Sequence, residues 1–157
     1  MFERFTYKAE QAFLFAEEEA VRVQKQQVDI RCLLVGLARV KALSSLVLNQ
    51  VGITPDKIRN SDTLTDSEFQ NGQIEDCILG RHHSDEISRI VSGTQFVSSK
   101  LSANYIGTEH LLLAILLNDS GAELVKELGV DADALCLVVL RLLSQRGLDP
   151  ETLRLPE

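Results

Sequence analysis

Three side chains that could bind a metal stand close together near the middle of the chain: Cys77, His82 and His83. The spacing Cys-x4-His-His matches no usual zinc site, which has four ligands in a tetrahedral arrangement, and no fourth ligand stands nearby. Adjacent histidines on a helix would also point in different directions. We therefore interpret these residues as part of a polar linker, and we expect neither a metal nor a cofactor.

The sequence also lacks the motifs of the common catalytic sites. His110 has no Ser, Cys or Asp at a recognisable motif position around it, so a nucleophile–base pair is not expected. A nucleotide-binding P-loop needs a glycine followed by Lys, and none of the nine glycines precedes a lysine. We interpret His110 as a structural residue at a helix start and predict that the chain is not an enzyme. A small helical hydrolase is the alternative, and no motif supports it.

Composition limits the partners and the compartment. The chain of 157 residues has a net charge of −7 and 45% hydrophobic residues, which suits one globular domain, and it offers no basic stripe for nucleic acid. Its longest apolar runs, such as Leu111–Leu117, are too short to cross a bilayer, and the N-terminus has no apolar signal sequence. The odd number of cysteines favours reduced thiols. We expect a cytoplasmic protein, or one of the chloroplast stroma if a transit peptide was removed, with protein partners.

A repeated pattern organises the chain. Asn104–Leu116 consists of a polar heptapeptide and an apolar run, and Gln26–Ala38 is a weaker copy of it. Each copy is followed by a polar step, a second apolar run and a glycine, at Gly52 and Gly129. Such a period is typical of duplicated supersecondary units that bury their apolar faces against each other. The sequence therefore predicts two structural repeats.

Capping residues and helical periodicity predict four helices in the first repeat. Thr6 is the natural N-cap of a segment with apolar residues at i, i+3 and i+4 spacing. Asp29 is expected to cap a helix from Ile30 to about Arg39. A third helix runs from about Ala42 to Gln50, and Thr54-Pro55-Asp56 marks the start of a fourth.

The second repeat is expected to contain four helices as well. Ser84 caps the first, Thr108 the second, Ser120 the third and Asp131 the last. Leu135–Leu140 would pass for a buried strand by its apolar run alone, but its cap and its surroundings favour a buried helix. No segment predicts a strand. The expected fold is all-α, with two pseudo-twofold four-helix repeats packed as one bundle.

The predicted boundaries divide a single domain, residues 1–157. Repeat one covers residues 1–60 and repeat two covers residues 83–145. A linker of polar, turn-prone composition, residues 61–82, connects them, and residues 146–157 form a terminal tail.

Three segments resemble a known family. Phe2–Thr6, Ala16–Ala20 and Asn104–Leu113 are similar to the N-terminal substrate- and adaptor-binding domain of the Clp/Hsp100 unfoldases, most closely the ClpC type. The resemblance covers about residues 1–145 of the sequence. It is weaker in repeat one, where the Gly-Thr-Glu-His positions read Asp29-Ile30-Arg31-Cys32, and at His83-Ser84, where an aromatic-Thr pair is usual.

The resemblance implies a non-catalytic protein-binding module of the Clp chaperone–protease system. Such a module would recruit adaptor proteins, substrate proteins, or Clp unfoldase or protease subunits. The degenerate first repeat favours a stand-alone accessory protein. The alternative is the isolated N-terminal domain of a full ClpC-type ATP-dependent unfoldase.

The resemblance also implies a binding site. In bacterial ClpC-type domains, the Glu of each Gly-Thr-Glu-His block and the hydroxyl residue that opens the first helix of the same repeat are associated with phosphoarginine recognition. That pattern places Ser84 with Glu109, and Thr6 with Arg31 as the degenerate counterpart. A helix start and a hydroxyl suit a phosphate and a carboxylate suits a guanidinium, so Arg31 predicts a dead first site. Alternatively, Thr6 and Ser84 are plain caps and Glu109 is an acid on a helix dipole.

Overall fold

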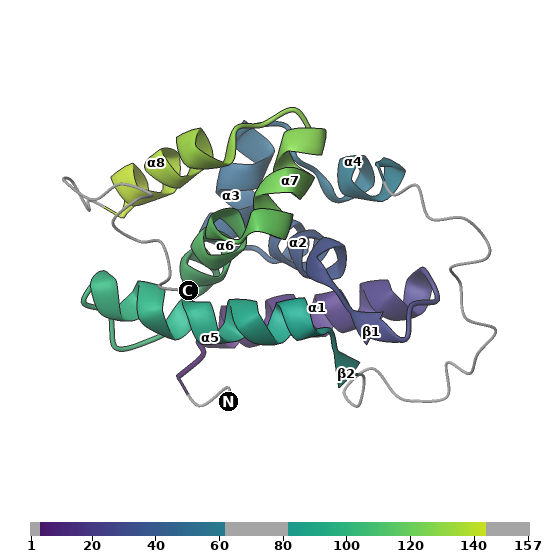
Figure 1. Ribbon diagram of the computed structural model, residues 1–157, viewed down its shortest axis with the longest axis horizontal. Coiled ribbons are helices and arrows are strands. Elements are labelled where there is room, and N and C mark those ends of the chain that lie inside the picture. Colours follow the sequence, from purple (N-terminus) through teal and green to yellow (C-terminus); the bar gives the residue numbers. More distant parts are fainter. Residues whose placement is uncertain (1–3, 62–81, 144–157) are drawn as a thin grey trace.

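The computed structural model describes residues 4–61 and 82–143 (Figure 1). Its helices in these ranges are α1 (Tyr7–Arg22), α2 (Ile30–Arg39), α3 (Leu43–Gln50), α4 (Pro55–Asn60), α5 (Asp85–Lys100), α6 (Thr108–Leu117), α7 (Asp119–Glu127) and α8 (Ala132–Leu142). Two strands of two residues each, β1 (Gln27–Val28) and β2 (His82–His83), accompany them. The predicted all-α class is confirmed.

The helices form two matching series, α1–α4 in repeat one and α5–α8 in repeat two. α1 and α5 both have 16 residues, and α2 and α6 both have 10. Gln24 and Ser102, which follow α1 and α5, share a left-handed φ of 61° and 58°. Gly52 and Gly129, which follow α3 and α7, share a φ of 83° and 90°. The repeat inferred from the sequence is therefore matched in helix order and in the turns.

Short backbone pairings join segments that precede helices in one repeat to segments that precede helices in the other. β1 pairs with β2 in parallel, and the Ser84 N–H donates to the Val28 carbonyl (3.0 Å). An isolated parallel bridge joins Phe5 to Ile106, and the Thr6 N–H donates to the Ile106 carbonyl (2.9 Å). The segment before the first helix of each repeat thus pairs with the segment before the second helix of the other repeat. The sequence predicted no strand, and these pairings are too short to leave a periodic pattern.

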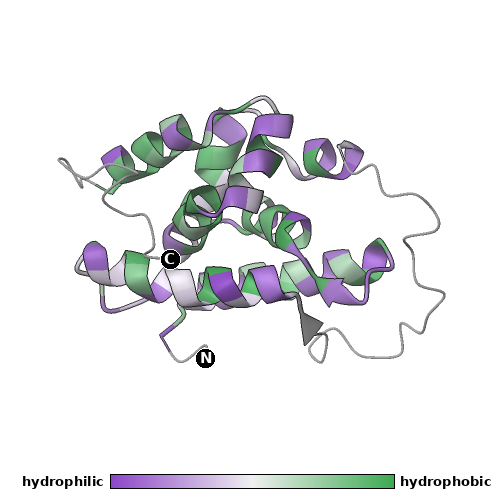
Figure 2. Ribbon diagram, viewed as in Figure 1, coloured by the Kyte–Doolittle hydropathy of each residue, from purple (hydrophilic) through white to green (hydrophobic). Residues whose placement is uncertain are grey.

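The core is centred on α2 and α6. Eight of the ten residues of each helix are buried. In Figure 1 the two helices lie in the middle of the molecule, with α1 and α5 on one side and α3, α7 and α8 on the other. Figure 2 shows both helices as largely hydrophobic. A helix that is apolar on most of its circumference must be covered on all sides, which explains this position.

The two repeats differ in how closely their first two helices approach. Gly36 of α2 faces Ala12 of α1 so closely that a Cβ at position 36 would collide with the Ala12 carbonyl oxygen. The residue of α6 at the matching position is Ala114, which is buried and carries that Cβ. The methyl group of Ala114 therefore keeps α5 and α6 from the same close approach.

A buried ion pair ties α1 to α4 in repeat one. Arg59 donates from two guanidinium nitrogens to the two carboxylate oxygens of Glu19, both at 2.9 Å, and Glu19 is only 3% exposed. The matching positions of repeat two hold Val97 and Cys136, both buried. One repeat thus has a bidentate ion pair at these positions, and the other has two buried residues without a formal charge.

Five of the predicted caps are confirmed and two are wrong. Thr6, Asp29, Thr54, Ser84 and Asp131 each accept a hydrogen bond from the backbone at the start of their helices.

In contrast, α6 begins one residue earlier than predicted, with Gly107 as its N-cap and Thr108 already helical. α7 is capped by Asn118, whose Oδ1 accepts from the Ser120 and Gly121 N–H groups (2.9 and 3.2 Å). A side-chain amide thus takes the role that was predicted for Ser120.

Two further predictions concern membranes and boundaries. Within residues 4–61 and 82–143, no single helix is long and apolar enough to span a bilayer; α2 and α3 pass that test only as a pair, bent by 98° at their break. The predicted linker, apart from its end residues, and the predicted tail lie outside the described residues. The domain boundaries stay predictions.

Candidate functional site

The start of α6 is capped by a histidine. The Gly107 N–H donates to Nδ1 of His110 (3.0 Å), and His110 is 2% exposed. Burial lowers the pKa of His110 below its ordinary value of 6.5, and the nearby Glu109 carboxylate offsets only part of that effect. Because the accepting nitrogen must be unprotonated, the neutral imidazole is the form that holds this helix start together.

Glu109 is the acid that remains accessible at this helix start. It stands at the second residue of α6 and is partly exposed. Its carboxylate folds back over the N-cap, where a side chain at position 107 would collide with it. The Tyr105 ring lies against the His110 ring, with centroids 5.3 Å apart. The position favours a carboxylate because it lies at the positive end of the helix dipole.

At the start of α2, the side chain of the N-cap residue itself accepts the backbone hydrogen bond. Oδ1 of Asp29, the N-cap, accepts from the Cys32 N–H (3.0 Å), and Oδ2 binds the Lys25 ammonium (2.7 Å). Burial alone would raise the pKa of Asp29, but the charge of Lys25 and the hydrogen bonds from Lys25 and Cys32 outweigh it, so the pKa is lowered. Burial raises the pKa of the Cys32 thiol, with the Asp29 charge adding to the effect. Cys32 is therefore a neutral thiol and a structural residue.

Arg31 occupies the place in α2 that Glu109 occupies in α6, and its guanidinium is already engaged. It donates to Oγ of Ser61 (2.6 Å) and to Oε2 of Glu127 in α7 (2.9 Å). The Arg31 side chain is 22% exposed and that of Glu127 is 56% exposed. The pair therefore joins the first repeat to the second near the surface.

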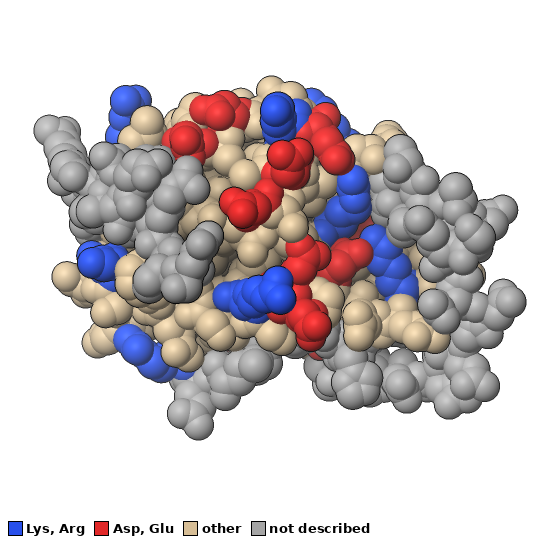
Figure 3. Space-filling view, viewed as in Figure 1, with Lys and Arg blue, Asp and Glu red and all other residues tan. Residues whose placement is uncertain are grey.

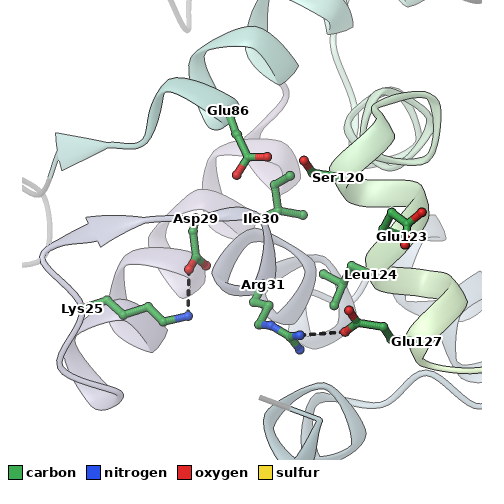
Figure 4. A pocket seen from close by; sticks show the side chains of 9 residues that line it. All are labelled: Lys25, Asp29, Ile30, Arg31, Glu86, Ser120, Glu123, Leu124 and Glu127. Carbon is green, nitrogen blue, oxygen red and sulfur yellow. Dashed lines mark hydrogen bonds and ion pairs between the residues drawn. The ribbon is translucent and has the colours of Figure 1, made fainter. Parts of the chain in front are cut away.

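A hollow of about 340 Å³ surrounds this pair, and we refer to it as the Arg31 pocket. The side chains that line it come from both repeats: Lys25, Asp29, Ile30, Arg31, Glu86, Ser120, Glu123, Leu124 and Glu127. Figure 4 shows Arg31 reaching Glu127 and Lys25 reaching Asp29 within it. In Figure 3 acidic side chains gather on this face, over α7 and the beginning of α5. The sequence missed the contributions of α5 and α7, because no local pattern connects them to α2.

The backbone pairings place the two hydroxyl residues across the repeats. Thr6 and Ser84 both cap their helices, through the Ala9 N–H (3.1 Å) and the Ile87 N–H (3.2 Å). Thr6 is hydrogen-bonded to Ile106, three residues before Glu109, whereas Ser84 is hydrogen-bonded to Val28, three residues before Arg31. The sequence pattern had paired Ser84 with Glu109 and Thr6 with Arg31, each within one repeat. The backbone contacts instead link each hydroxyl residue to the helix start of the other repeat.

Cys77, His82 and His83, which we interpreted from the sequence as part of a polar linker, are not described as a cluster of side chains. Cys77 lies outside the described residues, and of His82 and His83 only the backbone is described, as β2. Within the described ranges there is no group of three or more His, Cys, Asp or Glu side chains that could hold a metal ion.

The fold and these helix starts define a class: a helical repeat domain whose two halves share a backbone plan and differ in charge. The family model of the Clp repeat (R) N-terminal domain matches residues 4–122 and 82–147. The chain belongs to this Clp N-terminal domain family.

Known relatives agree with this assignment. The chain is 27% identical over 146 residues to the negative regulator of genetic competence ClpC/MecB of Bacillus subtilis, covering 91% of the chain and 17% of that relative. It thus spans less than a fifth of the length of this curated relative. Among solved structures, the N-terminal domain of the chaperone ClpD from Arabidopsis thaliana is 26% identical with a TM-score of 0.74, over 92% of this chain and 97% of that one.

A more distant structure shares the fold. The ClpV N-domain in complex with a VipB peptide is 17% identical, with a TM-score of 0.64, over 93% of this chain and 91% of that one. At this identity the similarity shows the fold alone.

Proposed function

We propose that this chain is a non-catalytic protein-binding module of the Clp system, which recruits adaptor proteins, substrate proteins or Clp subunits. The observation that carries the proposal is the match of the Clp repeat N-terminal domain over both halves of the chain. The ClpV N-domain, which has the same fold, is known in complex with a peptide, and this supports protein partners.

Two arrangements of this module are compatible with its relatives, which are much longer than the chain. We favour a stand-alone accessory protein, because repeat one has Arg31 at the position where the family has an acidic residue, and Arg31 forms an ion pair with Glu127. The second arrangement is the N-terminal domain of a full unfoldase. The length of the natural reading frame, ending after Glu157 or continuing into a P-loop domain, distinguishes them. A cytoplasmic or stromal location stays a prediction.

Affinity capture from the natural source tests the recruitment proposal. The tagged chain should enrich Clp unfoldase or protease subunits, or one of their adaptors, while its own ATP hydrolysis stays at the level of buffer. Recovery of unrelated proteins with no Clp component above background would contradict the proposal.

A second proposal concerns phosphoarginine. Glu109 is partly exposed at a helix start and forms no ion pair with another described residue, so it is available to a guanidinium. Arg31 presents the opposite charge at the matching place and is held by Glu127. We propose at most one phosphoarginine site, at the start of α6, with Thr6 as the neighbouring hydroxyl in place of Ser84.

Calorimetry with free phosphoarginine tests this site. One weak site should be seen, abolished by Glu109→Ala and unchanged by Arg31→Ala, because a charge-assisted hydrogen bond contributes about 1.5–3 kcal/mol. Comparing the phosphoarginine affinity of Thr6→Val with that of Ser84→Val shows which hydroxyl belongs to the site. Two equal sites would contradict the charge argument, and no binding would leave Glu109 as a helix-start acid.

A further inference from the structure

A groove on repeat two lies between α5 and α6, away from the Arg31 pocket. It has a volume of about 550 Å³, and we refer to it as the α5–α6 groove. Its main lining residues are Arg89, Ser92, Gly93 and Phe96 of α5 and Ala114 and Asn118 of α6.

The internal repeat explains why this groove exists. The residue of α1 that matches Gly93 of α5 is Phe15, counted from the helix starts. Phe15 packs against the core, and the Arg39 guanidinium lies over its ring at 4.2 Å from the centroid. Repeat one thus fills this place with its own aromatic side chain, whereas the matching residue of repeat two, Gly93, has no side chain.

The second cause is the spacing of the helices. Gly36 lets α2 approach the backbone of α1 at Ala12, and Ala114 prevents the same approach of α5 to α6. A wider spacing and a missing aromatic ring together leave a hollow whose lining includes the small residues Ser92, Gly93 and Ala114. Its shape suits an aromatic side chain supplied from outside, in the place that Phe15 takes in repeat one.

The charge of the groove indicates what would carry that side chain. Among the described residues that line it, Arg89 is the only charged one; it is exposed and forms no ion pair with another described residue. Lys100 adds a second cation, with its ammonium 5.4 Å from the centre of the Phe96 ring. In contrast, four acidic and two basic described residues line the Arg31 pocket, and the whole chain carries a net charge of −7. The α5–α6 groove is therefore a basic, partly apolar site on an acidic protein.

We propose that the α5–α6 groove binds an aromatic side chain in an acidic segment of a protein partner. The ring would enter the hollow between Gly93 and Ala114, and a neighbouring carboxylate would pair with Arg89. The proposal rests on the proposed function as a protein-binding module, and it names the chemistry of the segment that is bound.

A peptide titration tests the groove directly. The probe is a short fluorescein-labelled peptide with Asp-Phe-Glu at its centre between Gly-Ser spacers, and anisotropy reports binding to the intact chain. Two control peptides replace the Phe by Ala or both acids by Lys. We expect saturable binding of the probe alone, with amide shifts in an NMR titration confined to the region of Ser92, Gly93 and Ala114.

Variants of the chain locate the contact. Arg89→Glu should weaken binding about tenfold or more, as expected for loss of a charge-assisted contact. Arg141→Glu makes the same charge change at an exposed position of α8 outside the groove and should leave the affinity unchanged. Gly93→Phe should block binding of the probe, because it places an aromatic ring where repeat one has Phe15. An unaltered circular dichroism spectrum would show that this variant folds. If it does not fold, the result for Arg89→Glu alone tests the proposal.

Three results would overturn the proposal: no binding of the probe, equal binding of the Lys or Ala peptide, or amide shifts centred on the Arg31 pocket. These failures are distinguishable from failure of the proposed function. If affinity capture still recovers Clp components, and Arg89→Glu recovers them equally well, the module binds its partners elsewhere and only the groove proposal is lost.

Discussion

The starts of α2 and α6 occupy equivalent places in the two repeats and solve the same capping problem with opposite chemistry. At the start of α2, the N-cap side chain of Asp29 accepts from the N–H of Cys32. At the start of α6, the N-cap has no side chain, and His110 accepts from the N–H of Gly107 instead. The backbone plan is therefore kept while the side chains that cap the two helices differ.

The difference has a functional meaning. Around α2, charged side chains form ion pairs within the chain: Lys25 pairs with Asp29, and Arg31 pairs with Glu127. Around α5 and α6, Glu109 and Arg89 face solvent beside a helix start and a groove. We infer that repeat one has become the structural half and that repeat two has kept the binding surfaces.

The largest expected effect tests the close packing of repeat one. Gly36→Ala places a Cβ against the backbone of Ala12, where no flexible side chain can yield, and should destabilise the fold by about 3 kcal/mol. The matched change, Ala114→Gly, should cost only about 1 kcal/mol, as for glycine in a helix interior. Urea unfolding of both variants measures the difference. Equal losses would mean that the two helix pairs are packed alike.

A second comparison uses the buried ion pair. Arg59→Ala leaves the Glu19 carboxylate buried without its bidentate partner and should cost about 3 kcal/mol. Replacing both residues by apolar ones, Glu19→Val with Arg59→Met, imitates the buried uncharged residues Val97 and Cys136 of repeat two and should recover most of that loss. Thermal unfolding of the single and double variants checks this. A double variant as unstable as the single one would show that the polar pair is required.

The third prediction concerns pH. His110 has a folded pKa below its ordinary value of 6.5, so the unfolded chain binds the proton more readily and stability falls as the pH drops below about 6.5. The slope can reach about 1.4 kcal/mol per pH unit. Asp29, with a pKa lowered from 3.8, adds a separate loss below about pH 4. Unfolding at pH 7.5, 5.5 and 3.5 should show both steps.

His110→Gln is the control for the upper step. Its amide oxygen can accept from Gly107 without titrating, so the step between pH 7.5 and 5.5 should shrink while the acid step remains. An unchanged upper step would assign it to another group.

The smallest expected effect is at the Arg31–Glu127 pair. Glu127→Ala should cost about 0.5 kcal/mol, because the pair is half exposed, and the loss should disappear at high salt. Arg31→Glu should cost somewhat more, since it sets two carboxylates against each other. A loss of several kcal/mol would mean that this pair holds the repeats together.

The sequence predicted the elements better than the contacts between them. Caps whose own side chain accepts the first backbone donor, such as Thr6 and Asp29, were predictable from residue type. The cap at Gly107 was missed because its acceptor is supplied three residues later by His110. At α7, Asn118 took the role expected of Ser120 because its amide reaches two backbone donors.

The site was only partly predictable for the same reason. The replacement at Arg31 is visible in the weaker copy of the repeat, but its partner Glu127 lies 96 residues away. The pairing of β1 with β2 likewise joins residues from the two repeats, Gln27 with His82. Local patterns specify helices and caps, whereas contacts of this range depend on how the two repeats pack.

The central claim is that repeat two carries the binding surfaces, and amide hydrogen exchange tests it most directly. The chain is measured alone and in complex with the Clp subunit or adaptor that affinity capture recovers. We predict that protection rises most in α5, in α6 and in the Tyr105–Glu109 segment. Protection centred on the start of α2 and on α7, around the Arg31 pocket, would contradict the account.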